Sequence, residues 1–381
     1  MKYKYIFRKR KRKHKKFYIK IRHDIYSRKK FKFNSKKNKK NKIATGTIYK
    51  KSIYNKKIYK IAIDAPETLS FDNDNMNSTL EFFNKIRDIS DNKKRLFIKM
   101  KYLKYITPAA ALVLVSELDR LCCLHKTKIG VVDFNKWDNN IKNIFNDIGM
   151  YDFLDIKLSR KKRDSLINSN VNSNIIYLKF KSGINIDDGE KLEILNEIET
   201  IINNNNNNNN NNINGKKTLK VGITEAILNT HHHAYPDNFI NNSIYKDKKW
   251  WILGYINMDD NNIKIMIYDQ GITIPDTLDE KKYMIFNKND AEKIYTAVET
   301  DKSSTNMSNR GMGLQSIKMY AKKSDNGELV IISKKGYYKY AKNIDKIDSK
   351  LLKLDLKGTL ISWNGSIESE INIDETLYEE E

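Results

Sequence analysis

Almost all of the net charge of this 381-residue chain lies in its first 60 residues. They hold 26 of the 71 lysines and arginines and one acid, Asp24, whereas the remainder holds 45 bases and 46 acids. A segment so rich in like charges cannot bury a core and is expected to be disordered on its own. The sequence therefore predicts a basic disordered arm, residues 1–45, attached to a nearly neutral folded body.

Aromatic residues alternate with the bases of the arm, as in the run YKYIFRKRKRKHKKFY. Bases that neutralise phosphates release counterions, and aromatic rings stack on unpaired nucleobases. We therefore expect the arm to contact RNA, DNA or another polyanion, such as an anionic membrane surface, without reading its sequence. The alternative is a solubilising arm enriched in lysine by an AT-rich coding bias.

Two features bound the cellular setting. The longest apolar stretch, residues 106–115, is too short to cross a bilayer, and the N-terminus lacks the apolar segment of a secretory signal, so we expect a cytoplasmic protein without a transmembrane segment. The only cysteines, Cys122 and Cys123, are adjacent and lie in an apolar helical pattern. They are predicted to be reduced core residues.

The first part of the body alternates strand and helix patterns. Strands are predicted at residues 59–63, 96–100 and 129–134, and helices at 77–88, from Pro108 onward, and at 139–154. Proline suits the first turn of a helix because its missing N–H has no helical partner there. Strands that alternate with helices predict an α/β block, a small open sheet covered by helices.

This order of elements resembles the STAS domains of anti-sigma-factor antagonists. The segments YLKYITPAAALVLVSELDRL and NIKNIFNDIGMYDFLDI carry the resemblance, which covers residues 46–160, with a linker at 161–174. In the family the loop before the apolar helix carries an Asp-Ser-Ser/Thr phosphoacceptor, and here Thr107 is the only hydroxyl at that place. We favour Thr107 as a helix N-cap over a phosphorylation site. Without the acceptor, such a domain becomes a docking module.

The second part opens with a helical pattern at residues 218–235, VGITEAILNTHHHAY within it. Glu225 and Asn229, four residues apart, share one face of this helix, and Ile223 and Ile227 lie about 200° around from them. A carboxylate can accept a proton from water, and an amide oxygen is a suitable Mg²⁺ ligand. Taken alone, the pair is more simply a solvated polar face.

The features that follow strengthen the case for a site. A hairpin is predicted from residues 250–258 and 262–268. Asp269 and Gly271 come directly after it, and Gly311 and Gly313 precede a helix that ends near residue 322. Glycines at a helix start let backbone N–H groups approach a phosphate. Gly358 and Thr359 then open the strand GTLISW.

This series resembles the N box and the three glycine boxes of the GHKL ATPase superfamily, and most of all the anti-sigma-factor serine kinases. The resemblance covers residues 175–366 and implies an α/β sandwich of helices on an antiparallel sheet, with ATP held between helices and a lid at 290–309. A run of ten asparagines within 203–214 is expected to be a surface loop. Residues 367–381, rich in acids, are expected to be a solvated tail.

The resemblance assigns roles to individual residues. Glu225 would be the general base or the group that positions water, and Asn229 would bind Mg²⁺. At the base end, Asp269 would accept the hydrogen bond of the adenine amino group, with Gly271 and Thr359 beside it. Thr273 departs from the family, which often has glycine there. The phosphate loop would consist of Arg310, Gly311, Met312, Gly313 and Leu314.

The resemblance therefore implies an ATP-binding regulatory protein that uses ATP and Mg²⁺, hydrolysing ATP or transferring its γ-phosphate to Ser/Thr of a partner. The partner is expected to be a regulatory protein of the sigma-factor or antagonist kind, and a homodimer is left open. The alternative is a non-enzymatic, nucleotide-dependent switch tethered to nucleic acid by the arm. A sensor-kinase output domain is disfavoured because no phosphoacceptor-histidine helix pair precedes the block.

Two smaller groups of residues complete the expectations. His231, His232 and His233 point in different directions on a helix and so are not expected to share one zinc ion. Trp250 and Trp251 open an apolar strand and are predicted to be core residues.

Overall fold

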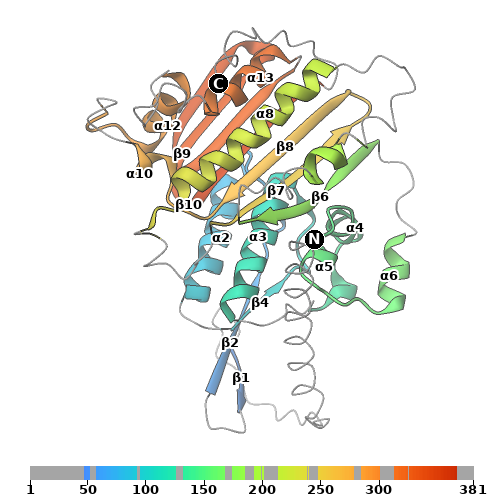
Figure 1. Cartoon of the computed structure of the whole chain (residues 1–381). Helices are drawn as coiled ribbons and strands as arrows, with labels where there is room; N and C mark the ends of the chain where they lie inside the picture. The colour runs from blue at the N-terminus through green and yellow to red at the C-terminus, as the bar shows by residue number, and fades with distance from the viewer. Residues whose placement is uncertain are drawn as a thin grey trace, which may run out of the picture. The chain divides into compact units, whose positions relative to one another are not determined.

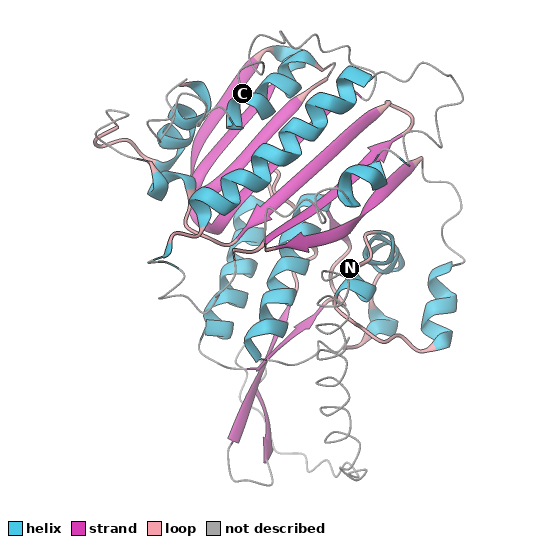
Figure 2. Ribbon diagram, in the orientation of Figure 1, coloured by secondary structure: helices cyan, strands magenta, loops and turns pink. Residues whose placement is uncertain are grey.

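The structure is a computed structural model. Its largest sheet has five antiparallel strands (Figure 2). Its strands are β6 (Ile175–Gly183), β7 (Trp250–Asn257), β8 (Asn262–Asp269), β9 (Glu328–Ala341) and β10 (Lys346–Ser366), in the order β6-β7-β8-β10-β9. The predicted hairpin at 250–268 is confirmed. The strand predicted to begin at Gly358 is longer than expected, because β10 pairs with β9 from Lys346 onward.

The structure describes residues 47–51, 57–91, 95–125, 132–167, 174–184, 193–198, 200, 213–237, 239, 248–278, 285–300, 313–324 and 326–366. The basic arm, the asparagine run and the acidic tail lie outside these ranges. The described part is mixed α/β, as the sequence predicted, with helices and an antiparallel sheet. No helix within it is long and apolar enough to span a membrane.

Helices cover both faces of the five-stranded sheet. Helices α8 (Ile213–Asn229), α12 (Asp290–Glu299) and α13 (Gly313–Lys323) pack on one face, where Figure 1 shows α8 running over the sheet in roughly the direction of its strands. Helices α2 (Met76–Asp91) and α3 (Pro108–His125) pack against the other. Trp250 points to the first face and Trp251 to the second, and both are fully buried. This explains why β7 is continuously apolar, since alternation disappears when both faces are covered.

The first part of the body contains a three-stranded mixed sheet. In it β2 (Lys57–Asp64) pairs antiparallel with β1 (Thr47–Lys51) and parallel with β4 (Arg95–Lys99). A parallel pair, β3 (Thr68–Leu69) with β5 (Tyr105–Ile106), precedes α3. The strands predicted at 59–63 and 96–100 and the helices predicted at 77–88 and from Pro108 are confirmed.

Two predicted elements of this part were wrong. Residues 132–134, the described end of the strand predicted at 129–134, are not a strand, and Phe134–Lys136 form a 3-10 helix. The helix predicted at 139–154 is broken into α4 (Asn139–Asp147) and α5 (Met150–Phe153), because Gly149 adopts φ 76° between them. Residues 161–167, the described beginning of the expected linker at 161–174, are helical and belong to α6 (Arg160–Ile167).

Side-chain expectations for α3 were met in part. The backbone N–H of Ala110 donates a 3.4 Å hydrogen bond to Thr107 Oγ1, as expected for the N-cap. The prediction that the cysteines are core residues was wrong, since Cys122 is half-buried and Cys123 is exposed. They follow the last buried turn of α3, at Leu121, where the helix leaves the core.

Candidate functional site

The predicted polar face of α8 meets the start of α13. Ile223 and Ile227 are buried in the core beneath α8, as expected. On the opposite side, a β-carbon added at Gly313 would lie 2.8 Å from Glu225 Oε2 and 2.8 Å from Asn229 Nδ2. Glu225 and Asn229, which are 88 and 84 positions from Gly313 in the sequence, thus lie against it, and the absence of a side chain at Gly313 is what allows this approach.

Asn229 and Gly313 line a cavity that opens to solvent, and Glu225 lies beside it. Its walls come from α8 and the π-helical turn after it (Thr230–Ala234), from the segment after β8, and from α12, α13 and β10. The lining residues are Ala226, Asn229, Thr230, His233, Ala234, Asp269, Ile272, Ile274, Thr277, Leu278, Ala297, Gly313, Leu314, Thr359 and Ile361. A mostly apolar cavity with a few convergent polar groups is typical of a small-molecule site.

Asp269 is the one carboxylate among the residues that line this cavity. It ends β8 and is 6% exposed. Burial raises the pKa of its carboxyl to about 7, although the hydrogen bond from Gly271 N–H to Asp269 Oδ1 (2.9 Å) and the charge of Arg87 act in the other direction. Asp269 is therefore a hydrogen-bond acceptor whose charge changes near neutral pH.

A second polar group supports the same end of the cavity. Thr359 lies opposite Asp269 on β10, and its hydroxyl is 2.8 Å from the hydroxyl of Ser333 on β9. Ser333 Oγ also accepts a hydrogen bond from the backbone N–H of Ile274 (2.9 Å). The buried hydroxyl pair therefore fixes Thr359 relative to the segment that follows β8.

The turn at residues 269–271 is held tightly against the end of α8. A β-carbon at Gly271 would lie 2.0 Å from the carbonyl oxygen of Ala234, so only glycine fits there. Tyr235 Oη accepts a hydrogen bond from Gln270 N–H (2.9 Å) and donates one to the carbonyl of Lys249 (2.6 Å). The run His-Ala-Tyr after α8 thus forms part of the wall and the support of the cavity.

The residues that the sequence singled out have different positions in the structure. Asn229, Asp269, Gly313, Leu314 and Thr359 line the cavity, Glu225 contacts Gly313 beside it, and Gly271 lies behind it against Ala234. Thr273 does not line the cavity. It stands at the N-cap position of α10 (Ile274–Thr277), and its hydroxyl donates to Asp276 Oδ2 (2.7 Å). Arg310, Gly311 and Met312 lie outside the described residues.

The structure also describes the beginning of the expected lid and the three consecutive histidines. The described beginning of the expected lid, 290–299, is a helix packed on β9, started by a capping box between Asn289 and Glu292. The three consecutive histidines lie on a turn of π-helix, and no group of ligand residues suited to a metal ion occurs in the described ranges.

Ser333, Tyr235 and His233 support or line the cavity without having been predicted as site residues. Tyr235 ends the segment VGITEAILNTHHHAY, which the sequence pattern had already marked as part of the site region. Its position next to the turn was therefore indicated in the sequence. Ser333 had none, because its importance depends on which strand pairs with β10.

Comparison with known proteins adds no relative. No protein-family model matches the sequence, and no curated protein matches it. The chemistry must therefore be argued from the site itself. That site combines a half-buried carboxylate, an amide, a glycine at a helix start, and a buried carboxyl at the opposite end.

Proposed function

We propose that the cavity binds ATP with Mg²⁺, and that the protein hydrolyses ATP or transfers its γ-phosphate to a partner protein. The observation that carries the proposal is the contact of Glu225 and Asn229 with Gly313 at the start of α13. Backbone N–H groups at a helix start favour an anion, and a carboxylate and an amide stand beside them. The resemblance to GHKL ATPases supports the same assignment.

The chemistry of the donor groups fits a metal–phosphate ligand. Asn229 Nδ2 is buried and has no hydrogen-bond partner in the described part of the chain, so the amide is not committed to a structural bond. A flip of this amide group exchanges its oxygen and its nitrogen, and would turn the oxygen of Asn229 toward the cavity. Bound Mg²⁺ would neutralise charge on the phosphates, with Asn229 as its protein ligand.

Glu225 supplies the proton acceptor in this proposal. Burial raises the pKa of its carboxyl, which makes the carboxylate a better base than an exposed glutamate. The oxygen of a water, or of a Ser/Thr hydroxyl, forms a bond to the γ-phosphorus, and its proton passes to Glu225. The bond between the γ-phosphorus and the bridging oxygen breaks, and ADP leaves with that oxygen.

The other end of the cavity suits a base with an amino group. Asp269 accepts hydrogen bonds when it is ionised, and Ile272, Ile274 and Leu278 provide apolar surface next to it. Gly358 brings the backbone of β10 close to the carbonyl of Asp269, which keeps this end narrow. These residues favour adenine over a base that presents an oxygen at the same place.

One experiment tests the proposal and separates its forms. ATP labelled at the γ-phosphate is incubated with the full chain and Mg²⁺, and the label is followed to water, to this chain or to an added protein. Calorimetry measures ATP binding in parallel. Label on phosphate supports hydrolysis, label on protein supports transfer, and binding with neither supports the non-enzymatic switch. Absence of ATP binding contradicts the proposal as a whole.

Replacement of Asn229 by alanine is expected to weaken Mg²⁺-dependent ATP binding about 100-fold, since a charged ligand loses a polar partner inside a cavity. Calorimetry with and without Mg²⁺ measures the effect. Thr224→Ala is the matched control, because Thr224 lies on α8 but does not line the cavity. Equal affinities of Asn229→Ala and wild type would remove Asn229 from the metal site.

The affinity for ATP is also expected to depend on pH through Asp269. Its pKa of about 7 means that the acceptor form is complete above neutrality and is lost as the pH falls. Affinity should therefore fall by up to about tenfold per pH unit below pH 7. Titration from pH 8 to pH 5.5 measures this, and Asp269→Asn should retain only the dependence that belongs to the nucleotide's own phosphate. The same slope in both proteins would contradict this role of Asp269.

A further inference from the structure

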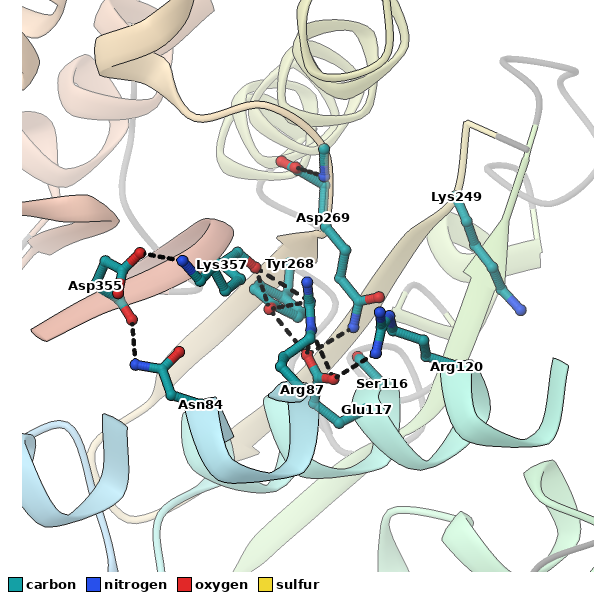
Figure 3. A network of polar contacts seen from close by, with 12 residues as sticks. Asn84, Arg87, Ser116, Glu117, Arg120, Lys249, Tyr268, Asp269, Asp355 and Lys357 are labelled. Atoms are coloured by element: carbon teal, nitrogen blue, oxygen red, sulfur yellow. Dashed lines mark hydrogen bonds and ion pairs between the residues drawn. The ribbon is translucent and has the colours of Figure 1, made fainter. Parts of the chain in front are cut away.

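A buried carboxylate joins the α2/α3 layer to the sheet. Glu117 on α3 is 1% exposed and accepts hydrogen bonds from Arg87 Nε (2.8 Å) and Arg87 Nη2 (2.7 Å) on α2 (Figure 3). Arg120 Nη1 lies 4.0 Å from Glu117 Oε2. Burying a carboxylate is expensive unless it is fully paired, so a group held in this way commits the surrounding side chains to one arrangement.

Glu117 also reaches the end of β8. Gln270 Nε2 donates a 3.0 Å hydrogen bond to Glu117 Oε1. Tyr268 Oη lies 3.4 Å from the same oxygen and donates to the carbonyl of Lys357 at 2.7 Å. Gln270 is buried, and its Oε1 has no hydrogen-bond partner among the residues that the structure describes. Glu117 is therefore the anchor of this amide.

Gln270 stands between the two residues that shape the base end of the cavity. Asp269 precedes it and lines the cavity, and Gly271 follows it and donates to Asp269 Oδ1. The backbone of Gln270 is bound by Tyr235 from the side of α8, while its side chain is bound by Glu117 from the side of α3. The turn is thus anchored by both helical layers that cover the sheet.

The charges around Glu117 also connect the α2/α3 layer to Asp269. Arg87, Arg120 and Glu117 together carry one net positive charge, which an ionised Asp269 balances. The charge of Arg87 lowers the pKa of Asp269 against the larger opposing effect of burial. The charged groups around Asp269 are Arg87 of α2 and Glu117 and Arg120 of α3. The other titratable groups are Tyr235, Tyr268 on the same strand as Asp269, and His233 on the cavity wall.

We propose that Glu117 is a positioning residue for the nucleotide site, which acts through Gln270 to hold Asp269 in place and so couples the α2/α3 layer to ATP affinity. The proposal rests on the function proposed above, because it assumes that the base of ATP contacts Asp269. A ligand or partner that displaces α3 relative to the sheet changes ATP affinity, and ATP stabilises the contact between α3 and the sheet in return.

The test compares Gln270→Met with wild type, using ATP and inorganic tripolyphosphate with Mg²⁺ as ligands. Methionine keeps the length of the side chain but removes the amide, and Glu117 keeps its pair with Arg87. ATP affinity is expected to fall about tenfold while tripolyphosphate affinity stays unchanged, because only the base end is disturbed. Asn84→Ala is the control: it removes another hydrogen bond between the layers, from Asn84 Nδ2 to the carbonyl of Asp355 (3.0 Å). It should leave both affinities unchanged.

A second variant, Glu117→Gln, tests the charge. It keeps an oxygen for Gln270 but removes the negative charge that partly neutralises Arg87. The charge of Arg87 lowers the pKa of Asp269, so the midpoint of the loss of ATP affinity at low pH should move to lower pH. A purely structural role predicts lower thermal stability with no shift of this midpoint. If Glu117→Gln does not fold, Gln270→Met decides the question.

The outcomes distinguish a failure of the proposed function from a failure of this inference. Wild type that fails to bind ATP contradicts the proposed function and this inference together. Wild type that binds ATP, with Gln270→Met binding it equally well, overturns the positioning role alone. A parallel loss of ATP and tripolyphosphate affinity also overturns it, because the defect would then extend over the whole cavity.

Discussion

Replacement of Glu225 by glutamine is expected to lower ATP turnover by about 10²–10⁴-fold while ATP affinity changes less than about threefold. Glutamine has nearly the same shape but cannot accept the proton of the attacking water or hydroxyl. Its contact with Gly313 and the position of Asn229 one turn away should be preserved. Phosphate release measured at saturating ATP gives the turnover, and calorimetry gives the affinity.

The matched control is Glu197→Gln. Glu197 is another half-buried glutamate, paired with Lys181 at 2.9 Å and absent from the cavity lining. Its replacement should leave turnover unchanged. If Glu225→Gln turns over ATP at the wild-type rate, another group accepts the proton and the assignment of Glu225 is wrong. If binding is lost as well, Glu225 has a role in holding the nucleotide rather than in the reaction.

Replacement of Gly358 by alanine is expected to lower the free energy of unfolding by about 2–6 kcal/mol, the largest stability effect that we predict. Gly358 has φ 109°, a conformation that side chains disfavour by about 1–3 kcal/mol. A β-carbon there would also lie 2.0 Å from the carbonyl oxygen of Asp269, and relieving that overlap costs about 1–3 kcal/mol more. Urea denaturation measures the change.

Gly222→Ala is the contrasting substitution. Gly222 lies within α8, and a β-carbon there would be 3.6 Å from Trp363 Nε1, an ordinary contact. Alanine is favoured over glycine in a helix by up to about 1 kcal/mol, so this variant should be as stable as wild type or more so. A loss of stability of similar size in both variants would mean that the close approach at Gly358 is not the cause.

The sequence predicted the second part of the body better than the first. The helical period placed Glu225 and Asn229 on one face, and turn residues located the hairpin that leads to Asp269. The glycines also mark close approaches: a β-carbon at Gly271 would overlap the backbone of Ala234, and one at Gly313 would crowd the side-chain ends of Glu225 and Asn229. These are local patterns, and local patterns do not depend on knowing which strands pair.

What sequence reasoning missed depends on long-range pairing. The hydroxyl pair of Ser333 and Thr359 exists because β9 and β10 are neighbours. The contact of Glu117 with Gln270 joins residues 153 positions apart, and a lone glutamate in an apolar helix gives no sign of its partner. The break at Gly149 was missed for a different reason, because glycine inside a helical pattern is often tolerated.

Both faces of the five-stranded sheet are covered, one by α8, α12 and α13 and the other by α2 and α3. This limits how the chain can be divided. A gene fragment that begins near residue 174 would leave Trp251, Leu253, Met266, Tyr268, Ile332 and Leu360 without the helices that cover them. Such a surface promotes aggregation. The half of the chain that holds the cavity therefore depends on the first block to cover the apolar face of its sheet.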